Sequence, residues 1–479
     1  MQASQAVDYS RKWYVMAAVG MSLFLATVDG SIVNVSLPTL VRELQTDFPT
    51  VQWVVLAYLL TQTTLMLSVG RLGDMIGKKQ IFTAGFVVFT IGSVLCGFSP
   101  TVHWLIAFRV VQAVGASMVL ALGFAIVTES FPPQERGRAL GINGSLVSIG
   151  IVTGPVLGGF IIENLNWHWI FFVNLPIGII GTIMALRFIP DFHPEGGQRF
   201  DFAGAITLFI SLLALLLGLT LGQNLGLNDP LVLVLLAVWV LFLFIFIYIE
   251  MHAEQPMIDL HIFRTTLFTV NISTGLLTFI CIAGALILVP FYLENVLGFT
   301  TQKVGILFAI VPIAMGITAP ISGSLSDRFG TRPITITGLL VIASGYLAMT
   351  TLSTDTSEIG YLLRMAPIGI GMGIFQSPNN SAIMGAVPNE RLGIASGLLS
   401  ITRTLGQTTG IALLGAFWAF RTLAYNNAPL PGGATTASPV FQLGGMQDTF
   451  LVTASLIGLA LFISFVGLQY ERRAAQATA

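Results

Sequence analysis

The sequence predicts an all-α polytopic membrane protein, and three observations support that fold class. Of the 479 residues, 54% are hydrophobic and only 9% are charged, whereas a soluble domain carries about 25% charged residues. Mean hydropathy is +0.85. Long apolar stretches recur along the whole chain and lack the two-residue alternation of a transmembrane β-barrel. These features exclude a soluble enzyme, and a net charge of −1 does not favour nucleic-acid binding.

Fourteen apolar stretches are long enough to cross a bilayer core of about 30 Å. They cover residues 14–37, 52–70, 81–98, 104–127, 139–162, 168–189, 203–222, 231–250, 266–290, 303–324, 333–352, 360–384, 392–417 and 449–468. Their spacing predicts an N-terminal six-helix bundle (1–195), two inserted helices (196–262) and a C-terminal six-helix bundle (263–479). Cys96 and Cys281 lie in apolar stretches, so neither a disulfide nor a metal site is expected.

The distribution of basic residues predicts the orientation of these spans. Fifteen Lys and Arg residues fall in the segments on the N-terminal side of the predicted membrane, and three fall on the other side: Arg42, Lys303 and Arg421. Because basic residues are enriched in cytoplasmic loops, both termini are expected in the cytoplasm.

Two sets of residues repeat at nearly the same offset. The segment Gly70-Arg-Leu-Gly-Asp-Met-Ile-Gly-Lys-Lys79 returns as Gly323-Ser-Leu-Ser-Asp-Arg-Phe-Gly-Thr-Arg332, 253 residues later. Arg109, Pro133, Glu135 and Arg136 return 255 residues later as Arg364, Pro388, Glu390 and Arg391. Two parallel six-helix repeats around a central cavity are a transporter arrangement. Residues 203–250 have no counterpart and look like an insertion.

These motifs resemble the major facilitator superfamily over nearly the whole chain. Gly70–Lys79 resembles its loop 2–3 motif, Leu105–Gly115 its fourth-span arginine motif, and Gly141–Gly159 its fifth-span antiporter motif. Two further segments, Leu25–Pro38 and Trp167–Pro176, resemble the drug/proton antiporter branch with fourteen spans, the EmrB/QacA type. The family usually has Arg where His168 stands and Gln where Glu294 stands. The resemblance implies the superfamily fold and multidrug export, although this branch also contains exporters of narrower substrates.

Asp29 is the strongest candidate for coupling transport to protons. An ionisable side chain inside the hydrocarbon region is costly and usually functional. At 1.5 Å per residue, Asp29 lies about 12 Å and Arg109 about 9 Å from the outer ends of their spans, so the two side chains can pair if these spans adjoin. If Asp29 loses its contact with Arg109 in an apolar cavity, the Asp29 carboxylate should bind a proton. A static buried ion pair is the alternative for Asp29, and a substrate-anion anchor is the alternative for Arg109.

The loop motif is a candidate gate. Asp74 is placed to bridge to Arg136 or Arg138 and to latch the helices in one access state, with Gly70, Arg71, Gly73, Gly77 and Lys78 as the rest of the motif. The simpler interpretation is that these basic residues only orient the protein.

The fifth-span glycines are a candidate seam. Gly150, Gly154 and Gly158 share one helix face and permit a close crossing, while Pro155 bends the helix and Gly159 follows. The resemblance implies a tight seam between the halves; an ordinary helix contact is the alternative.

Embedded polar and aromatic side chains are candidates for lining a substrate cavity. They are Asn34, Gln62, Gln112, Asn143, Asn271, Tyr292, Gln376, Asn379 and Arg403. Arg403 lies near mid-membrane and requires a partner or a wet cavity. Arg364, close to the outer face, is expected to have a structural role, and Glu294 to be a carboxylate facing water at the rim.

We therefore expect a secondary transporter that needs no cofactor. No Gly-x-x-x-x-Gly-Lys-Ser/Thr phosphate loop occurs, so a proton gradient is the expected energy source. The expected function is antiport of protons for amphiphilic, cationic or lipophilic drugs by a monomer in the bacterial inner membrane. A narrow exporter of a metabolite, a lipid or glycolipid flippase, and a membrane enzyme are the alternatives; an enzyme is disfavoured because all five histidines lie in loops or at span ends. A periplasmic partner cannot be deduced from the sequence.

Overall fold

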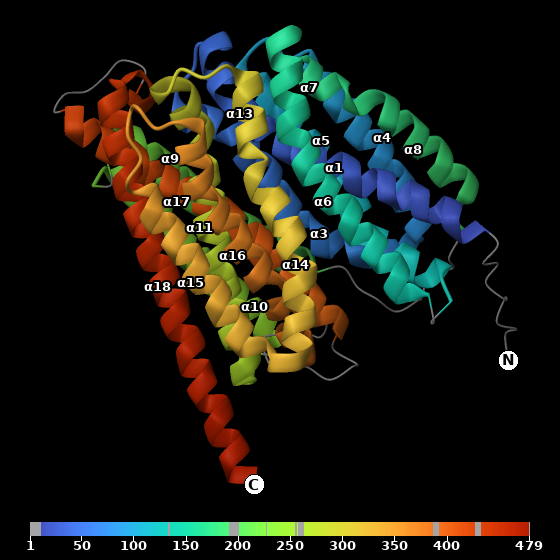
Figure 1. Ribbon diagram of the computed structural model, residues 1–479. Coiled ribbons are helices and arrows are strands. Elements are labelled where there is room, and N and C mark those ends of the chain that lie inside the picture. Colours follow the sequence, from blue (N-terminus) through green and yellow to red (C-terminus); the bar gives the residue numbers. More distant parts are fainter. Residues whose placement is uncertain are drawn as a thin grey trace, which may run out of the picture.

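The computed structural model describes residues 11–132, 135–190, 201–226, 228–253, 256, 263–386, 392–426 and 433–478. Within these ranges the regular structure is entirely helical, which confirms the all-α prediction. Helices of the two halves meet at the end of the molecule away from the termini and diverge toward the termini (Figure 1). We call these ends the closed end and the terminal end.

The first half contains helices that correspond to the first six predicted spans. They are α1 (Lys12–Glu43), α2 (Phe48–Val51), α3 (Trp53–Ile76), α4 (Lys78–Gly97), α5 (Val102–Ser130), α6 (Arg136–Asn164), α7 (Trp169–Phe172) and α8 (Asn174–Phe188). The inserted pair is α9 (Phe202–Leu225) and α10 (Pro230–His252).

The second half repeats this organisation with more interruptions. It comprises α11 (Thr266–Leu286), α12 (Val289–Phe291), the π-helix η3 (Tyr292–Val296), α13 (Thr301–Phe308), α14 (Ile310–Phe329), α15 (Thr331–Met349), α16 (Glu358–Gly385), α17 (Leu392–Asn426), the 3₁₀-helix η5 (Gly433–Thr436) and α18 (Pro439–Thr478). Breaks occur between α11 and α12 and between α13 and α14.

Every predicted span lies on these helices, but their apolar character differs. Ten helical segments of the described chain are long and apolar enough to cross a membrane. The other four stretches lie on α3, α6, α16 and α17; α3, α6 and α17 include side chains outside the described residues, and α16 carries polar side chains such as Asn379. The total of fourteen spans therefore stays a prediction.

The repeated loop motif has the same backbone form in both halves. Gly77 ends α3 with φ +119°, and Gly330 ends α14 with φ +84°. In each case the next helix begins at the following residue. Glycine adopts positive φ without the steric cost of a side chain. The two halves thus share a helix–glycine–helix unit at equivalent positions, which explains why this glycine recurs in the sequence repeat.

The halves pack against each other at the closed end. The Phe48 ring lies 5.1 Å from the Phe291 ring and 4.7 Å from the Trp418 ring, both edge-on. On the opposite side of the interface, α6 packs on α13, where a side-chain carbon added at Gly159 would come within 2.5 Å of the Thr301 carbonyl oxygen. Such close approach of backbones requires small residues at the contact.

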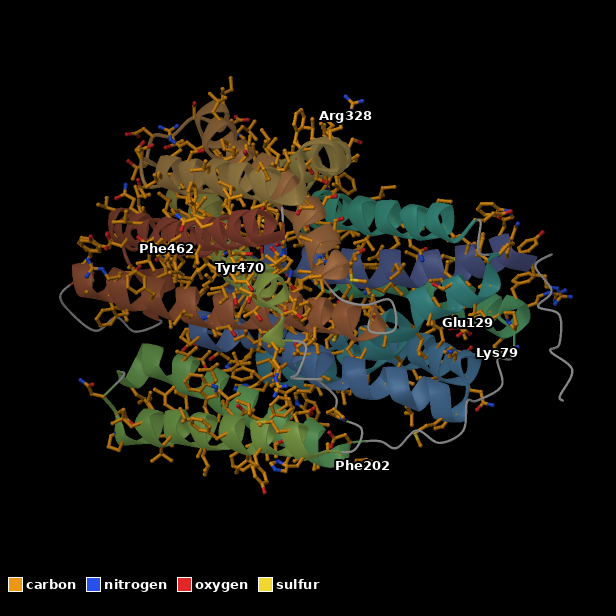
Figure 2. The ribbon with its side chains drawn as sticks, turned by 90° about the horizontal axis from the view of Figure 1, so that it is seen from below. Lys79, Glu129, Phe202, Arg328, Phe462 and Tyr470 are labelled. Carbon is orange, nitrogen blue, oxygen red and sulfur yellow. The ribbon has the colours of Figure 1, made fainter. Side chains whose placement is uncertain are left out.

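The inserted helices cover one side of the interface between the halves. α9 packs against both α3 and α17, and Trp53 Nε1 donates to Thr220 Oγ1 at 3.2 Å. Only 11% of the apolar window of α10 is buried, so its remaining surface is available to lipid. Figure 2, seen from below relative to Figure 1, places Phe202 of α9 and Arg328 of α14 on opposite sides of the molecule.

Candidate functional site

Asp29 lies at the centre of a buried polar cluster in the first half. Its side chain is fully buried in α1, and its Oδ2 accepts a hydrogen bond from Arg109 Nη1 at 2.5 Å. Its Oδ1 accepts from Gln112 Nε2 at 2.7 Å and from Asn174 Nδ2 at 3.0 Å. The carboxylate is therefore held by donors from α5 and α8, as a buried charge must be if it is to remain ionised.

Arg109 is equally well satisfied. Its Nε donates to the Val54 carbonyl oxygen at 3.0 Å, and its Nη1 also donates to Gln112 Oε1 at 2.6 Å. The guanidinium carbon lies 4.1 Å from the centre of the Tyr58 ring, in cation–π contact. These contacts join α1, α3 and α5 around one ion pair, so a change in charge at Asp29 acts on three helices at once.

The structure thus brings together three residues that the sequence singled out separately: Asp29, Arg109 and Gln112. Sequence reasoning did not select Asn174 and Ser93, although Ser93 Oγ accepts from Gln112 Nε2 at 2.8 Å. Asn174 lies in the quoted segment Trp167–Pro176 and is polar at the start of an apolar span, which was an available signal. Ser93 gives no such signal because serine is common in membrane helices.

The cavity candidates divide into two groups by exposure. Five are at most 2% exposed and sit inside the bundles: Gln112, Asn143, Asn271, Tyr292 and Asn379. Four are half-buried: Asn34, Gln62, Gln376 and Arg403. Near Asn34, a side-chain carbon added at Gly30 would meet no atom within 4 Å. A side chain at this position would therefore meet no neighbour, and the half-buried residues are the more accessible of the candidates.

The buried candidates of the second half stabilise its own packing. Arg332 Nη1 donates to Asn271 Oδ1 at 2.8 Å, and Asn379 Nδ2 donates to the Asn271 carbonyl oxygen at 3.3 Å. Tyr292 donates its hydroxyl hydrogen to the Ser353 carbonyl oxygen at 2.8 Å. These residues link helices of one bundle and do not face open space in this conformation.

The candidate gate is described only in part. The side chains of Arg71, Asp74, Arg136 and Arg138 lie outside the described residues. Gly73 packs against Leu122 of α5, and Gly70 faces open space. Lys78 Nζ pairs with Glu129 Oε1 at 2.5 Å, which ties the start of α4 to the end of α5.

The glycines of the fifth-span motif have two different neighbours. Gly150, Gly154 and Gly158 pack on α1, within the same bundle, and Ser31 Oγ donates to the Gly150 carbonyl oxygen at 3.4 Å. Pro155 and Gly159 instead contact α13 of the second half. The motif therefore forms a contact inside one bundle and, on another face of the helix, a seam between the halves.

Glu294 and Arg364 lie near the closed end. The expectation that Glu294 faces water is wrong: its side chain is 4% exposed, and Oε2 pairs with Arg42 Nη1 at 2.8 Å. The π-helix η3 turns this carboxylate toward α1, so the pair connects the two halves. Arg364 Nε donates to Thr351 Oγ1 and its Nη1 to the Gly360 carbonyl oxygen, both at 2.9 Å, which gives Arg364 a local structural role.

Replacing Glu294 by Gln is expected to loosen the closed end. Loss of the charge weakens the Arg42 contact by about 1 kcal/mol and shifts the equilibrium between access states. A Val304→Cys reporter, at a position now fully buried in α13, should react about threefold to tenfold faster with a maleimide. Glu358→Gln, which removes a pair with Lys303 inside one half, is the matched control. Equal labelling of both variants would show that the Arg42–Glu294 pair does not hold the closed end together.

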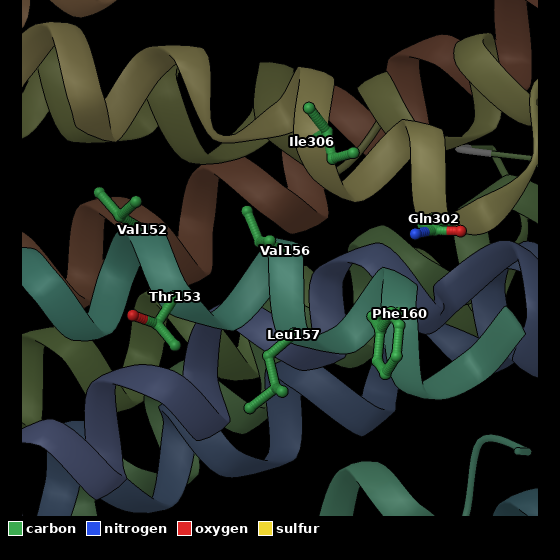
Figure 3. A pocket seen from close by; sticks show the side chains of 7 residues that line it. All are labelled: Val152, Thr153, Val156, Leu157, Phe160, Gln302 and Ile306. Atoms are coloured by element: carbon green, nitrogen blue, oxygen red, sulfur yellow. The ribbon is translucent and has the colours of Figure 1, made fainter. Parts of the chain in front are cut away.

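An apolar pocket of about 410 Å³ lies on the α6–α13 side of the interface. Figure 3 shows its lining side chains, five from α6 and two from α13: Val152, Thr153, Val156, Leu157, Phe160, Gln302 and Ile306. Three of them (Val156, Phe160 and Ile306) are between 40% and 56% exposed, and the lining carries no charged side chain. The pocket therefore suits hydrocarbon rather than a charged headgroup.

A helical membrane protein with a buried ion pair in its first half and half-buried polar side chains along its helices has the features of a membrane transporter. The comparison with protein families agrees: the family "Major Facilitator Superfamily" matches residues 19–411. The chain belongs to this superfamily.

Two relatives similar to this chain are bacterial transporters. The chain is 37% identical to "Riboflavin transporter RibZ" of Clostridioides difficile, over 87% of this chain and 90% of that protein. It is 31% identical to "Multidrug transporter protein MdtP" of Bacillus subtilis, over 94% and 84%. A solved bacterial homolog of the human lysosomal transporter Spinster, in an inward-facing and unoccupied conformation, has the same fold, with a TM-score of 0.67 at 18% identity over 95% of this chain and 97% of that one.

Proposed function

We propose that this protein is a proton-coupled antiporter that exports amphiphilic organic compounds from the cytoplasm by alternating access. The observation that carries this proposal is the buried Asp29 carboxylate, which accepts hydrogen bonds from Arg109, Gln112 and Asn174. Protonation of Asp29 removes the charge that holds Arg109 and so changes the contacts of α1, α3 and α5 together. A single proton thereby biases the arrangement of the first half.

The observed conformation fits one half of such a cycle. If both termini are cytoplasmic, as the basic residues predict, the closed end faces outward and the open space beside Gly30 opens inward. Contacts at Phe48, Arg42–Glu294 and Gly159 would then seal the outer side. In the outward-facing state these contacts must separate, and the gate motif with Asp74, Arg136 and Arg138 would close the inner side. Fourteen spans of the EmrB/QacA type, a monomer and the bacterial inner membrane complete the proposal.

A narrow-specificity exporter is the second candidate, because the riboflavin transporter is 37% identical over most of both chains. Flavin and multidrug substrates share a planar ring system with polar substituents, which half-buried amides such as Gln62 and Gln376 suit. A flippase for lipids or glycolipids is less well supported, since the pocket between α6 and α13 offers no charged side chain to a headgroup.

Everted vesicles that contain the protein test these candidates directly. Under an imposed proton gradient, ethidium and riboflavin are offered separately, with and without an uncoupler. Uncoupler-sensitive accumulation of ethidium supports a multidrug antiporter, and accumulation of riboflavin alone supports the narrow exporter. Accumulation that persists with the uncoupler would overturn proton coupling.

A further inference from the structure

We propose that Arg403 binds an anionic group of the transported molecule, so that the preferred substrates are anionic amphiphiles rather than cations. This inference deepens the proposed function and rests on it for the direction of transport. It starts from the unsatisfied guanidinium of Arg403, which lies eleven residues into α17, or about 16 Å along the helix axis from its start.

Arg403 differs from the other arginines within the helical bundles. Arg109 is bound by Asp29, Val54 and Gln112, and Arg332 by Asn271. In the described part of the chain, Arg403 makes no hydrogen bond or ion pair, and its guanidinium carbon lies 6.0 Å from the centre of the Phe279 ring. An arginine carries five donors that must be satisfied when it leaves bulk water.

The neighbourhood of Arg403 provides further donors. Gln407 lies one turn along α17, on the same face, and is half-buried. α3 runs antiparallel to α17, and Gly415 of α17 contacts Gln52 just before α3. Because the two helices are antiparallel, moving ten residues from this contact toward the terminal end places half-buried Gln62 of α3 at the level of residue 405 of α17. One guanidinium and two amides thus lie at a similar height, on helices from the two halves that pack against each other.

The charge around this position is positive. Two buried acids that the structure describes within the bundles are neutralised: Asp29 by Arg109 and Glu294 by Arg42. Counting along α3, Gln62 lies eight residues beyond Val54, the residue that binds Arg109, so the Arg403 level is about 12 Å from the ion pair along the axis. Among the described residues, no carboxylate pairs with Arg403, so a cationic drug would meet its positive charge, whereas an anion would gain charge-assisted hydrogen bonds.

The proposal has a consequence for energetics. Export of a monoanion in exchange for an inward proton moves two elementary charges in the same electrical direction. Transport should then respond to membrane potential as well as to the pH gradient. Exchange of a monovalent cation for one proton moves no net charge.

A matched pair of dyes tests the charge preference. Fluorescein, anionic at pH 8, and rhodamine 123, a cation, share the xanthene ring system. Binding of each dye to the purified full-length protein is measured by fluorescence anisotropy. We expect wild type to bind fluorescein more tightly, and Arg403→Gln to raise the Kd of fluorescein about tenfold or more while changing that of rhodamine 123 less than threefold. Arg403→Lys should recover part of the affinity.

Arg364→Gln is the control, since that arginine is bound by Thr351 and Gly360 near the closed end. Wild type that prefers rhodamine 123, or an Arg403→Gln variant that loses both dyes equally or neither, would overturn the proposal. Binding requires no gradient, so its outcome is independent of proton coupling. Fluorescein binding without uncoupler-sensitive transport would support the anion site at Arg403 and contradict proton-coupled antiport.

Discussion

Replacement of Asp29 by Asn is expected to abolish gradient-driven transport while the protein still folds and binds substrate. Asparagine keeps the size of the side chain, and its oxygen still accepts hydrogen bonds from Gln112 and Asn174, whose nitrogens lie 2.7 and 3.0 Å from Asp29 Oδ1. It cannot exchange a proton or attract Arg109 as an anion. Proton-driven accumulation in everted vesicles should fall to the level of vesicles without the protein.

Asp448→Asn is the control for loss of an acid. Asp448 pairs with Arg421 at 2.7 Å in a partly exposed position, so its loss should change transport less than about twofold. Substrate binding to purified Asp29→Asn protein separates a coupling defect from misfolding. Normal uncoupler-sensitive accumulation by Asp29→Asn would eliminate Asp29 as the coupling residue and leave the pair as a structural feature of the bundle.

Gly305→Val is expected to open the closed end and to slow transport. A side chain at Gly305 would collide with the Pro155 carbonyl oxygen of α6. Overpacking of this kind costs about 1–3 kcal/mol, which shifts the balance of access states by roughly tenfold or more. The maleimide reactivity of Val304→Cys should rise accordingly, and substrate transport should fall by a similar factor because one conformation of the cycle becomes scarce.

Gly316→Ala provides the comparison within the same span. A carbon added at Gly316 of α14 meets no atom within 4 Å, so transport and Val304→Cys reactivity should remain close to those of the parent protein. If Gly305→Val behaves like Gly316→Ala, the seam between α6 and α13 does not control the access state.

Much of the fold could be predicted because the lengths of the apolar stretches and the internal repeat are visible in the sequence. The recurrence of Gly77 as Gly330 predicts equivalent helix junctions, and both glycines have positive φ. Interruptions such as the π-helix η3 could not be predicted, since they depend on the packing of two bundles.

The part of the site that could be predicted is the ion pair, because its two side chains lie at a similar depth in their spans. Asp29 and Arg109 lie at similar depths in their spans and pair as that depth suggests. The other ligands of the carboxylate depend on which helix faces pack together, and this information is absent from a single sequence. The same limit applies to Glu294, because the turn that buries its carboxylate against Arg42 is set by the second half as a whole.

The position of α9 determines how a molecule dissolved in the bilayer can reach the interior. Because α9 touches both α3 and α17, lipid is excluded from that edge of the molecule. The opposite edge, at α6 and α14, has no such cover from the inserted pair, and the apolar pocket lies along it. We therefore expect lateral entry from the membrane to be one-sided, so that hydrophobic compounds dissolved in the bilayer approach from the α6 side.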